Sequence, residues 1–160
     1  MDTRTDKTTT LKHKFWTTLA DSPFVFLQID GDPQTAVPMM AQLDSAAQST
    51  IWFFTSRRGP LAQGGAATAT FTGKAHDLFA RFSGRLVEET DPARLELEWS
   101  PAVQAWFPGG KDDPNLLMLR MELATAEIWN LDYGLINTAK MMLGYDIRET
   151  AAAQHVQTTL

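Results

Sequence analysis

The spacing of apolar residues changes from helical to extended early in the chain. Leu11, Phe15 and Leu19 recur at intervals of four with polar residues between them, which predicts a short amphipathic helix that ends before Pro23. Stretches of β-branched and aromatic residues then alternate with turn signals such as Asp30-Gly31-Asp32-Pro33. The pattern predicts five strands, the first three in meander order, over residues 24–29, 35–42, 51–55, 66–71 and 78–86.

The second half of the chain carries two helix-start signals and a further pair of strands. Asp91-Pro92 and Ser100-Pro101 each place a capping residue before a proline, which predicts two short helices that meet at the serine. Residues 116–123 and 124–130 have the composition of strands, and residues 135–143 that of a short helix ending at Gly144. About seven strands are expected, a number that favours closure of the sheet into a barrel.

The length and composition predict one globular domain. The chain has 160 residues, of which 44% are apolar and 21% charged. We expect a single domain over residues 10–145, with residues 1–9 and 146–160 as tails that are mobile or form edge elements. The sequence lacks an apolar run of membrane-spanning length, and its first residues do not have the apolar region of a secretory signal. A cytoplasmic location without membrane contact is therefore the expectation.

Charge and residue usage argue against several classes of function. The net charge of −5 disfavours a nucleic-acid partner, because no basic stripe is present to neutralise phosphates. The chain has no cysteine and three widely separated histidines, so we expect no disulfide, no thiolate nucleophile and no metal site. Glycine patterns of nucleotide-binding loops and of serine hydrolases are absent. The carboxylates between Glu88 and Glu98 are expected to form a solvated face.

The strongest candidate for binding chemistry is the end of the central strand. An unbroken apolar run, Ile51–Phe54, is followed by two hydroxyl residues and two arginines, Thr55-Ser56-Arg57-Arg58, and then by Gly59-Pro60. Hydroxyl donors and guanidinium groups on a turn suit an anion. The same pattern is also compatible with an ordinary core strand followed by a solvated turn.

A second candidate is the aromatic segment before a turn-rich loop. Trp106 and Phe107 directly precede Pro108-Gly109-Gly110, which places large aromatic faces at the edge of a rigid loop. Such faces can wall a planar ligand or pack in a subunit interface. An alternative is that the tryptophan fills the end of the sheet.

Four segments together resemble one known family. Trp52–Ser56, Ser83–Arg85, Trp99–Pro114 and Ala126–Asn130 are similar, in this order, to the general stress protein branch of the pyridoxamine 5'-phosphate oxidase-like superfamily. The resemblance spans nearly the whole chain. It implies a mainly β fold, a six- or seven-stranded split barrel with short flanking helices, that forms a homodimer with FMN, rather than FAD, in a groove between the subunits.

The resemblance also implies which residues approach the flavin. Pro38, Met39 and Met40 would lie along the isoalloxazine edge, and Phe54, Thr55 and Ser56 would approach the ribityl chain and phosphate. Arg57 and Arg58 are expected to hold the phosphate, and Trp106 and Trp129 to lie near the ligand groove. Trp129 matches the tryptophan that relatives place near the flavin from the partner subunit.

Two positions depart from the family pattern. Val37 stands where many relatives have an arginine, and Gly59-Pro60-Leu61 stands where they have Ser-x-Lys.

The resemblance as a whole favours a stress-related FMN-binding protein, with an FMN-dependent oxidoreductase of unknown substrate as its enzymatic form. Pyridoxamine-phosphate oxidase activity is not expected, and no side chain is assigned as an acid or base. The alternative is a flavin-free dimeric binding or interaction protein on the same fold.

Overall fold

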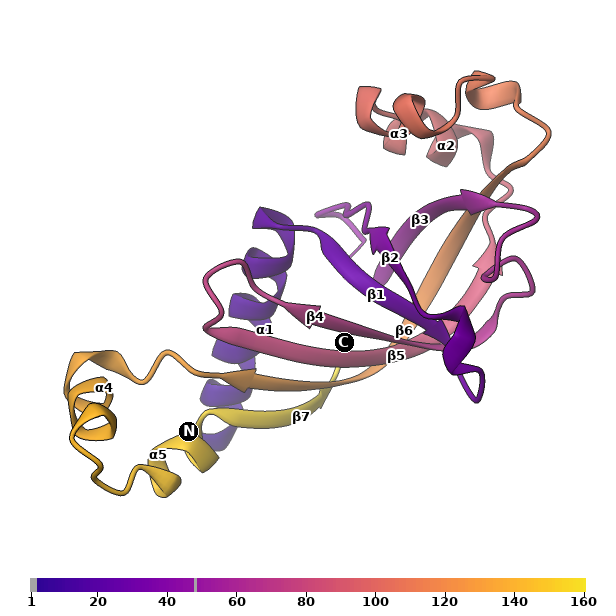
Figure 1. Cartoon of the computed structure of the whole chain (residues 1–160). Helices are drawn as coiled ribbons and strands as arrows, with labels where there is room; N and C mark the ends of the chain where they lie inside the picture. The colour runs from indigo at the N-terminus through magenta and orange to yellow at the C-terminus, as the bar shows by residue number, and fades with distance from the viewer. Residues whose placement is uncertain (1–2, 48) are drawn as a thin grey trace.

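One antiparallel sheet organises the chain, and the α-helices of the described residues lie beside it and at its ends (Figure 1). The computed structural model describes residues 3–47 and 49–160. The elements in chain order are α1 (Thr3–Asp21), β1 (Phe24–Ile29), the 3-10 helix η1 (Pro33–Thr35), β2 (Val37–Met40), β3 (Thr50–Ser56), β4 (Gly65–Thr72), β5 (Leu78–Glu88), α2 (Pro92–Glu98), α3 (Pro101–Trp106), η2 (Gly110–Asp112), β6 (Leu116–Asn130), α4 (Gly134–Met142), α5 (Arg148–Ala153) and β7 (His155–Thr159).

The sheet closes almost completely into a barrel. Its strand order is β2-β1-β4-β5-β6-β3, and β7 pairs with β6 outside this path. An isolated antiparallel bridge between Gln42 and Trp52 joins the segment after β2 to β3. The expected mainly β fold, a six- or seven-stranded split barrel with short flanking helices, is therefore confirmed. The meander expected for the first three strands is wrong, because β3 pairs along its whole length with β6.

The core forms where apolar side chains of the strands point inward against α1. Leu11, Phe15 and Leu19, the predicted helical stripe, are all buried. Phe15 meets Phe71 of β4 and Phe82 of β5 edge to face, at centroid distances of 6.3 and 5.5 Å. Edge-to-face aromatic pairs add to the energy of area burial, so α1 is an integral part of the barrel core.

The N-terminal helix is longer than its apolar stripe predicts. It begins at Thr3, in the segment that we expected to be a tail. The hydroxyls of Thr8, Thr9 and Thr10 each donate to the carbonyl four residues earlier, and Lys7 Nζ donates to the carbonyl of His155 on β7 at 3.4 Å. Contact with β7 thus explains helical order in a segment without apolar periodicity.

The two last strands that the pattern predicted are one strand. β6 runs without interruption through 15 residues. The inward-pointing residues are odd-numbered up to Met121 and even-numbered from Ala126 onward. The register with β5 shifts in the same region, between Phe82 and Gly84. A β-bulge produces this change of parity inside a continuous strand. The seventh strand is instead β7, within the segment 146–160 that was expected to be mobile or an edge element.

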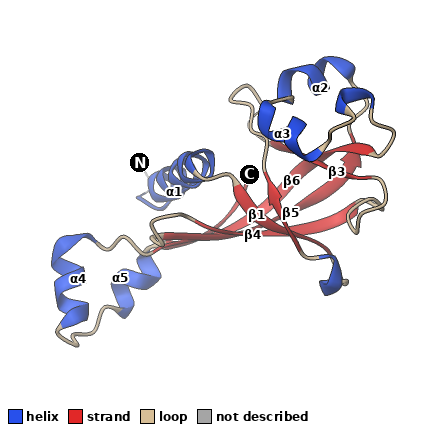
Figure 2. Ribbon diagram, turned by 45° about the horizontal axis from the view of Figure 1, so that its top comes forward, coloured by secondary structure: helices blue, strands red, loops and turns tan. Residues whose placement is uncertain are grey.

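The helices after the first fall into two groups at opposite ends of the sheet (Figure 2). The predicted pair α2 and α3 is confirmed: Asp91 Oδ1 accepts from the backbone N–H of Ala93 at 2.9 Å, and Ser100 Oγ from that of Val103 at 3.3 Å. We call residues 131–153, which contain α4 and α5, the arm.

Over the described residues, no helix is long and apolar enough to cross a membrane.

Candidate functional site

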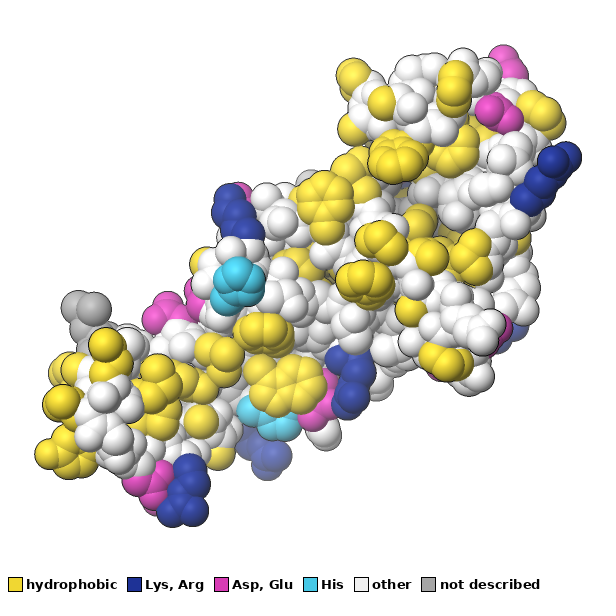
Figure 3. All heavy atoms as spheres, viewed as in Figure 1, with side chains coloured by type: hydrophobic (Ala, Val, Ile, Leu, Met, Phe, Trp, Pro, Cys, Tyr) yellow, Lys and Arg dark blue, Asp and Glu magenta, His cyan; other side chains and the backbone are white. Residues whose placement is uncertain are grey.

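An apolar groove lies on the outer face of the sheet. It has a volume of about 500 Å³, within the usual range of ligand pockets. We call it the aromatic groove, and the side chains used below are those of Phe24, Phe26, Pro38, Phe79, Arg81 and Trp129. Phe24 and Phe26 are 60% and 56% exposed, although each is a large apolar side chain. Figure 3 shows apolar side chains gathered on this face of the sheet.

The strand register explains why these residues meet. Phe26 of β1 pairs with Pro38 of β2 on one side and with Thr70 of β4 on the other. Phe79 of β5 pairs with Trp129 of β6. Alternation along each strand points these side chains outward, while Val25 and Leu27 between them are buried. The groove is thus a property of five paired strands.

A polar cluster borders the aromatic groove at Trp129. The indole ring of Trp129 stacks on the imidazole of His155 at 5.2 Å, and the Arg81 guanidinium lies 6.0 Å from the indole centroid. Glu127 forms an ion pair with Arg81, and its Oε1 lies 2.9 Å from His155 Nε2. A hydrogen bond from Gln157 and then those from His155 and Arg81 lower the pKa of Glu127. The cluster holds Trp129 in a fixed orientation beside the groove.

At the predicted anion site at the end of β3, some of the polar groups are already bonded to other residues. Ser56 Oγ lies 3.0 Å from Asn115 Oδ1 and accepts the backbone N–H of Arg58 at 3.1 Å. Arg57 Nη2 donates to Glu88 Oε1 at 2.5 Å, and this bond lowers the pKa of Glu88. The Arg58 side chain is exposed and has no ion pair with the described residues. Arg57 therefore needs to leave a carboxylate before it can hold a phosphate.

A second arginine faces the same pocket as Arg57. A pocket of about 420 Å³ is lined by Arg57, by Arg85 of β5, and by Gly64 and Gly65, which lie just before and at the start of β4. Arg85 is exposed, and its guanidinium forms no ion pair with the described part of the chain. We call this the arginine pocket. Sequence reasoning did not single out Arg85 as a phosphate ligand, because its proximity to Arg57 depends on the pairing of β4 with β5 and on the turn that follows β3.

The remaining predicted residues lie in different surroundings. Met39 packs against the core, Phe54 meets the Trp99 ring edge to face at 5.7 Å beneath α2, and Thr55 is half-buried. Trp106 is 82% exposed at the end of α3, whereas Trp129 lies near the end of β6, where that strand pairs with β7. Figure 1 shows α3 and β7 in different parts of the molecule. Within one chain the structure brings Pro38 together with Trp129, but it brings neither of them to Arg57, nor Trp106 to Trp129.

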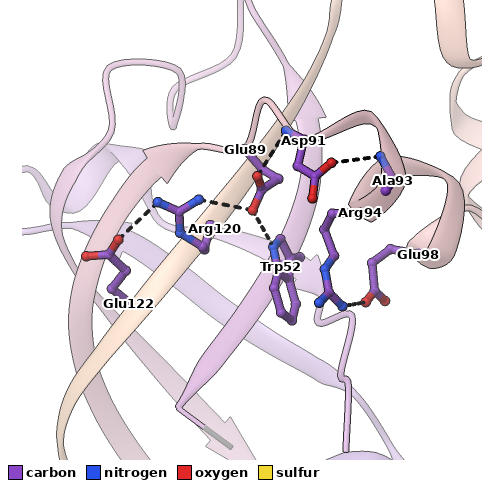
Figure 4. Close-up of polar contacts among 8 residues, drawn as sticks. All are labelled: Trp52, Glu89, Asp91, Ala93, Arg94, Glu98, Arg120 and Glu122. Carbon is purple, nitrogen blue, oxygen red and sulfur yellow. Dashed lines mark hydrogen bonds and ion pairs between the residues drawn. The ribbon is translucent and has the colours of Figure 1, made fainter. Parts of the chain in front are cut away.

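The carboxylates expected to be solvated instead form a partly buried network (Figure 4). Glu89 Oε2 accepts from Trp52 Nε1 and from Arg120 Nη1, both at 3.0 Å. The Arg94 guanidinium lies over the Trp52 ring, 4.2 Å from the ring centroid. It donates hydrogen bonds to Glu98 at 3.0 Å and to Asp44 at 2.5 Å. The expectation of a solvated face is wrong for Glu89 and Glu98, because Arg120 of β6 partners Glu89, and Arg94, four residues earlier in α2, partners the buried Glu98.

The two glutamates respond to burial in opposite ways. Burial acts to raise the pKa of Glu89, but hydrogen bonds from Trp52, the Asp91 backbone and Arg120 together lower it. Burial raises the pKa of Glu98, and its bond with Arg94 offsets this only in part. The ion pairs of Arg94 with Asp44 and of Arg120 with Glu89 join the α2 region to the barrel. Phe54 contacts Trp99 in this region and does not line the aromatic groove.

Comparison with known proteins identifies the family. A model of pyridoxamine 5'-phosphate oxidase-like proteins matches residues 11–151 of the chain. The chain belongs to this family. No curated protein matched it in a sequence search.

Solved structures of the general stress branch of this family are similar over most of the chain. The general stress FMN/FAD binding protein of Xanthomonas citri is 42% identical, with a TM-score of 0.71, and the match covers 79% of this chain and 93% of that one. A protein of Xanthomonas campestris pv. campestris described as a general stress family member is 43% identical, with a TM-score of 0.69 and coverage of 76% and 88%. One of Jannaschia sp. CCS1 described as general stress protein 26 is 28% identical, with a TM-score of 0.71 and coverage of 95% and 98%.

Proposed function

We propose that this protein is a flavin-binding general stress protein that holds FMN between the two subunits of a homodimer. The observation that carries the proposal is the exposed aromatic groove of about 500 Å³ on the sheet of a pyridoxamine 5'-phosphate oxidase-like protein. The naming of a 42% identical relative as an FMN/FAD binding protein supports it. An isoalloxazine ring is planar and largely apolar, so it fits the aromatic walls.

The residues of the groove suit the flavin ring. Pro38 and Trp129 lie on its two sides, and both were expected at the ring. Pro38 would hold the ring edge, with Met39 and Met40 following along β2, and Trp129 would approach the ring from the other side of the groove. The flavin, when bound, supplies redox chemistry, and the protein supplies orientation and electrostatics. An oxidoreductase function would therefore rest on the cofactor and not on a catalytic side chain.

The arginine pocket and the end of β3 suit the phosphate. A phosphate dianion leaving water needs charge-assisted donors, and guanidinium groups provide paired N–H bonds. Arg57, Arg58 and Arg85 are the candidates, with the hydroxyls of Thr55 and Ser56 nearby. They would replace the arginine and the lysine that are missing at Val37 and Leu61.

The test compares two flavins on wild-type protein and on single variants. FMN and riboflavin are titrated while the visible spectrum and the tryptophan fluorescence are followed. FMN is expected to bind wild type more tightly than riboflavin, and Arg58→Ala to weaken FMN binding roughly tenfold or more, because hydrogen bonds to charged groups are strong. Riboflavin binding should not respond to Arg58→Ala. Lys74→Ala, which removes an exposed cation paired with Asp21 at the opposite end of β4 from the arginine pocket, is the matched control.

Three results would decide against the proposal or its parts. Failure of both flavins to bind would overturn the function as a whole. Equal affinities for FMN and riboflavin in wild type would show that the arginines form a solvated turn. A monomer in sedimentation at micromolar concentration would exclude a site between subunits.

A further inference from the structure

We propose that the arm of one subunit crosses to the second subunit and covers its aromatic groove. This inference rests on the proposed dimer and adds to it the segment that closes the flavin site. A groove on the sheet surface is open to water on one side, so the partner's arm would supply the missing wall. The same contact would occur twice, once for each subunit.

The arm is too apolar and too short to be stable without a packing partner. Ile136, Met142 and Leu143 are 74%, 81% and 76% exposed. The two helices have nine and six residues, whereas isolated helices shorter than about 12–15 residues are marginal in water. None of the described side chains in either helix is buried. The arm therefore needs a surface that its own chain does not provide.

The arm and the groove lie next to each other but do not meet in one chain. Both ends of the arm are fixed, because Trp129 of β6 pairs with His155 of β7. From these ends α4 and α5 extend away from the sheet (Figures 1 and 2). Trp129, which lies two residues before the arm, is itself a wall of the groove. A two-fold axis close to Trp129 would bring each arm over the groove of the other subunit.

The exposed apolar area matches the needs of a dimer. Eight large apolar side chains in the arm and groove are 42–81% exposed: Phe24, Phe26, Leu131, Ile136, Met141, Met142, Leu143 and Tyr145. If each exposes roughly 100 Å², a value derived from the 150–250 Å² of an aromatic side chain, the total is roughly 800 Å². A standard interface buries about 800 Å² on each partner. A second copy of the chain accounts for both surfaces at once.

Charged side chains on the arm do not oppose this contact. Arg148 and Asp146 form an ion pair with each other at 2.6 Å, and both are exposed. In the view of Figure 3 the visible charged groups of the arm lie at its lower edge, and several groups of apolar side chains lie over the rest of it. The apolar cluster can thus be buried while the ion pair stays in water.

The test uses single thiols in a chain that has no cysteine of its own. A Phe26→Cys chain is mixed with a Met142→Cys chain, allowed to exchange subunits, and treated with a short bismaleimide. A mixed product, in which one Phe26→Cys chain is covalently joined to one Met142→Cys chain, is expected and is identified by its mass. Mixing Phe26→Cys with Leu97→Cys is the matched control, because Leu97 is 66% exposed on α2, outside the arm and the groove.

A second pair of variants tests the contribution to affinity in the full-length chain. Ile136→Ser with Met142→Ser should raise the dissociation constant of the dimer at least about a hundredfold, since two apolar side chains lose their burial. Leu97→Ser should leave it unchanged. A stable dimer that gives no mixed product, and whose affinity the double variant does not change, would overturn arm exchange. Such a result would leave the proposed flavin function intact, because flavin titration of wild type tests that function separately.

Discussion

Replacing Glu89 or Glu98 with the neutral glutamine should change the free energy of unfolding differently, lowering it at Glu89 and leaving it unchanged or higher at Glu98. Glu89 accepts hydrogen bonds from Trp52 and Arg120 at 3.0 Å each and from the Asp91 backbone at 3.1 Å, which lowers its pKa against the effect of burial. In Glu89→Gln the amide group must face at least one of these donors. Hydrogen bonds to charged groups contribute about 1.5–3 kcal/mol, so the free energy of unfolding should fall by about 2 kcal/mol at pH 7.

Glu98 should behave differently because burial raises its pKa. A glutamine at this position can still accept from Arg94 through its oxygen, and it no longer buries a charge. Glu98→Gln should therefore leave the stability at pH 7 unchanged or raise it by up to about 1 kcal/mol.

The pH dependence follows from the two directions of shift. The stabilising contribution of Glu89 is present above the ordinary glutamate value of 4.5 and is lost as pH falls through its lower, folded-state pKa. The contribution of Glu98 is present below 4.5 and is lost as pH rises through its higher, folded-state pKa. On acidification from pH 7, the difference between Glu98→Gln and wild type should thus disappear first. The Glu89→Gln difference should persist to below pH 4.5.

Urea unfolding followed by tryptophan fluorescence measures these differences, because Trp52 is part of the network and Trp99 is the C-cap residue of α2. The curves are recorded for wild type and both variants at several pH values between 7 and 4. The reasoning fails if Glu89→Gln is as stable as wild type at pH 7, or if Glu98→Gln loses more stability than Glu89→Gln.

Three further predictions address the bulge, a helix cap and the arginine pocket. Gly84→Ala should destabilise the barrel by more than about 2 kcal/mol in urea unfolding, because its Cβ would lie 2.3 Å from the carbonyl oxygen of Glu122; wild-type stability would contradict this. Ser100→Ala should cost about 1 kcal/mol through loss of the cap, whereas an unchanged midpoint would show that the cap is dispensable. Glu88→Gln should strengthen FMN binding two- to fivefold by releasing Arg57, and weaker FMN binding would mean that the ion pair positions this arginine.

Local signals predicted the elements whose structure depends on neighbours in sequence. The caps at Asp91 and Ser100 predicted two helices because the capping bond spans two or three residues. The strand pair at 116–130 could not be distinguished from one bulged strand, since the bulge depends on the partner β5. The pairing of β3 with β6 left no local trace, because these strands are far apart in the sequence.

The candidate site shows the same limit more strongly. The resemblance placed Pro38 and Trp129 near a ligand, and the structure sets them on one groove. Phe24 and Phe26 were predicted as strand residues, but their apolar composition did not reveal that their face is exposed. Glu98 was predicted to be a solvated acid, because the sequence does not show that the Arg94 beside it also pairs with Asp44, more than fifty residues before Glu98. Which polar groups become partners is decided by tertiary structure.

The late position of β6 affects the chain while it is being synthesised. β3, with the apolar run Ile51–Phe54, pairs with residues 116–122, so its ladder cannot form until more than sixty further residues have left the ribosome. During that interval an apolar strand with an unpaired edge is exposed to other chains. We expect the yield of native protein during synthesis to depend on chaperones and on temperature more than the stability of the finished barrel would suggest.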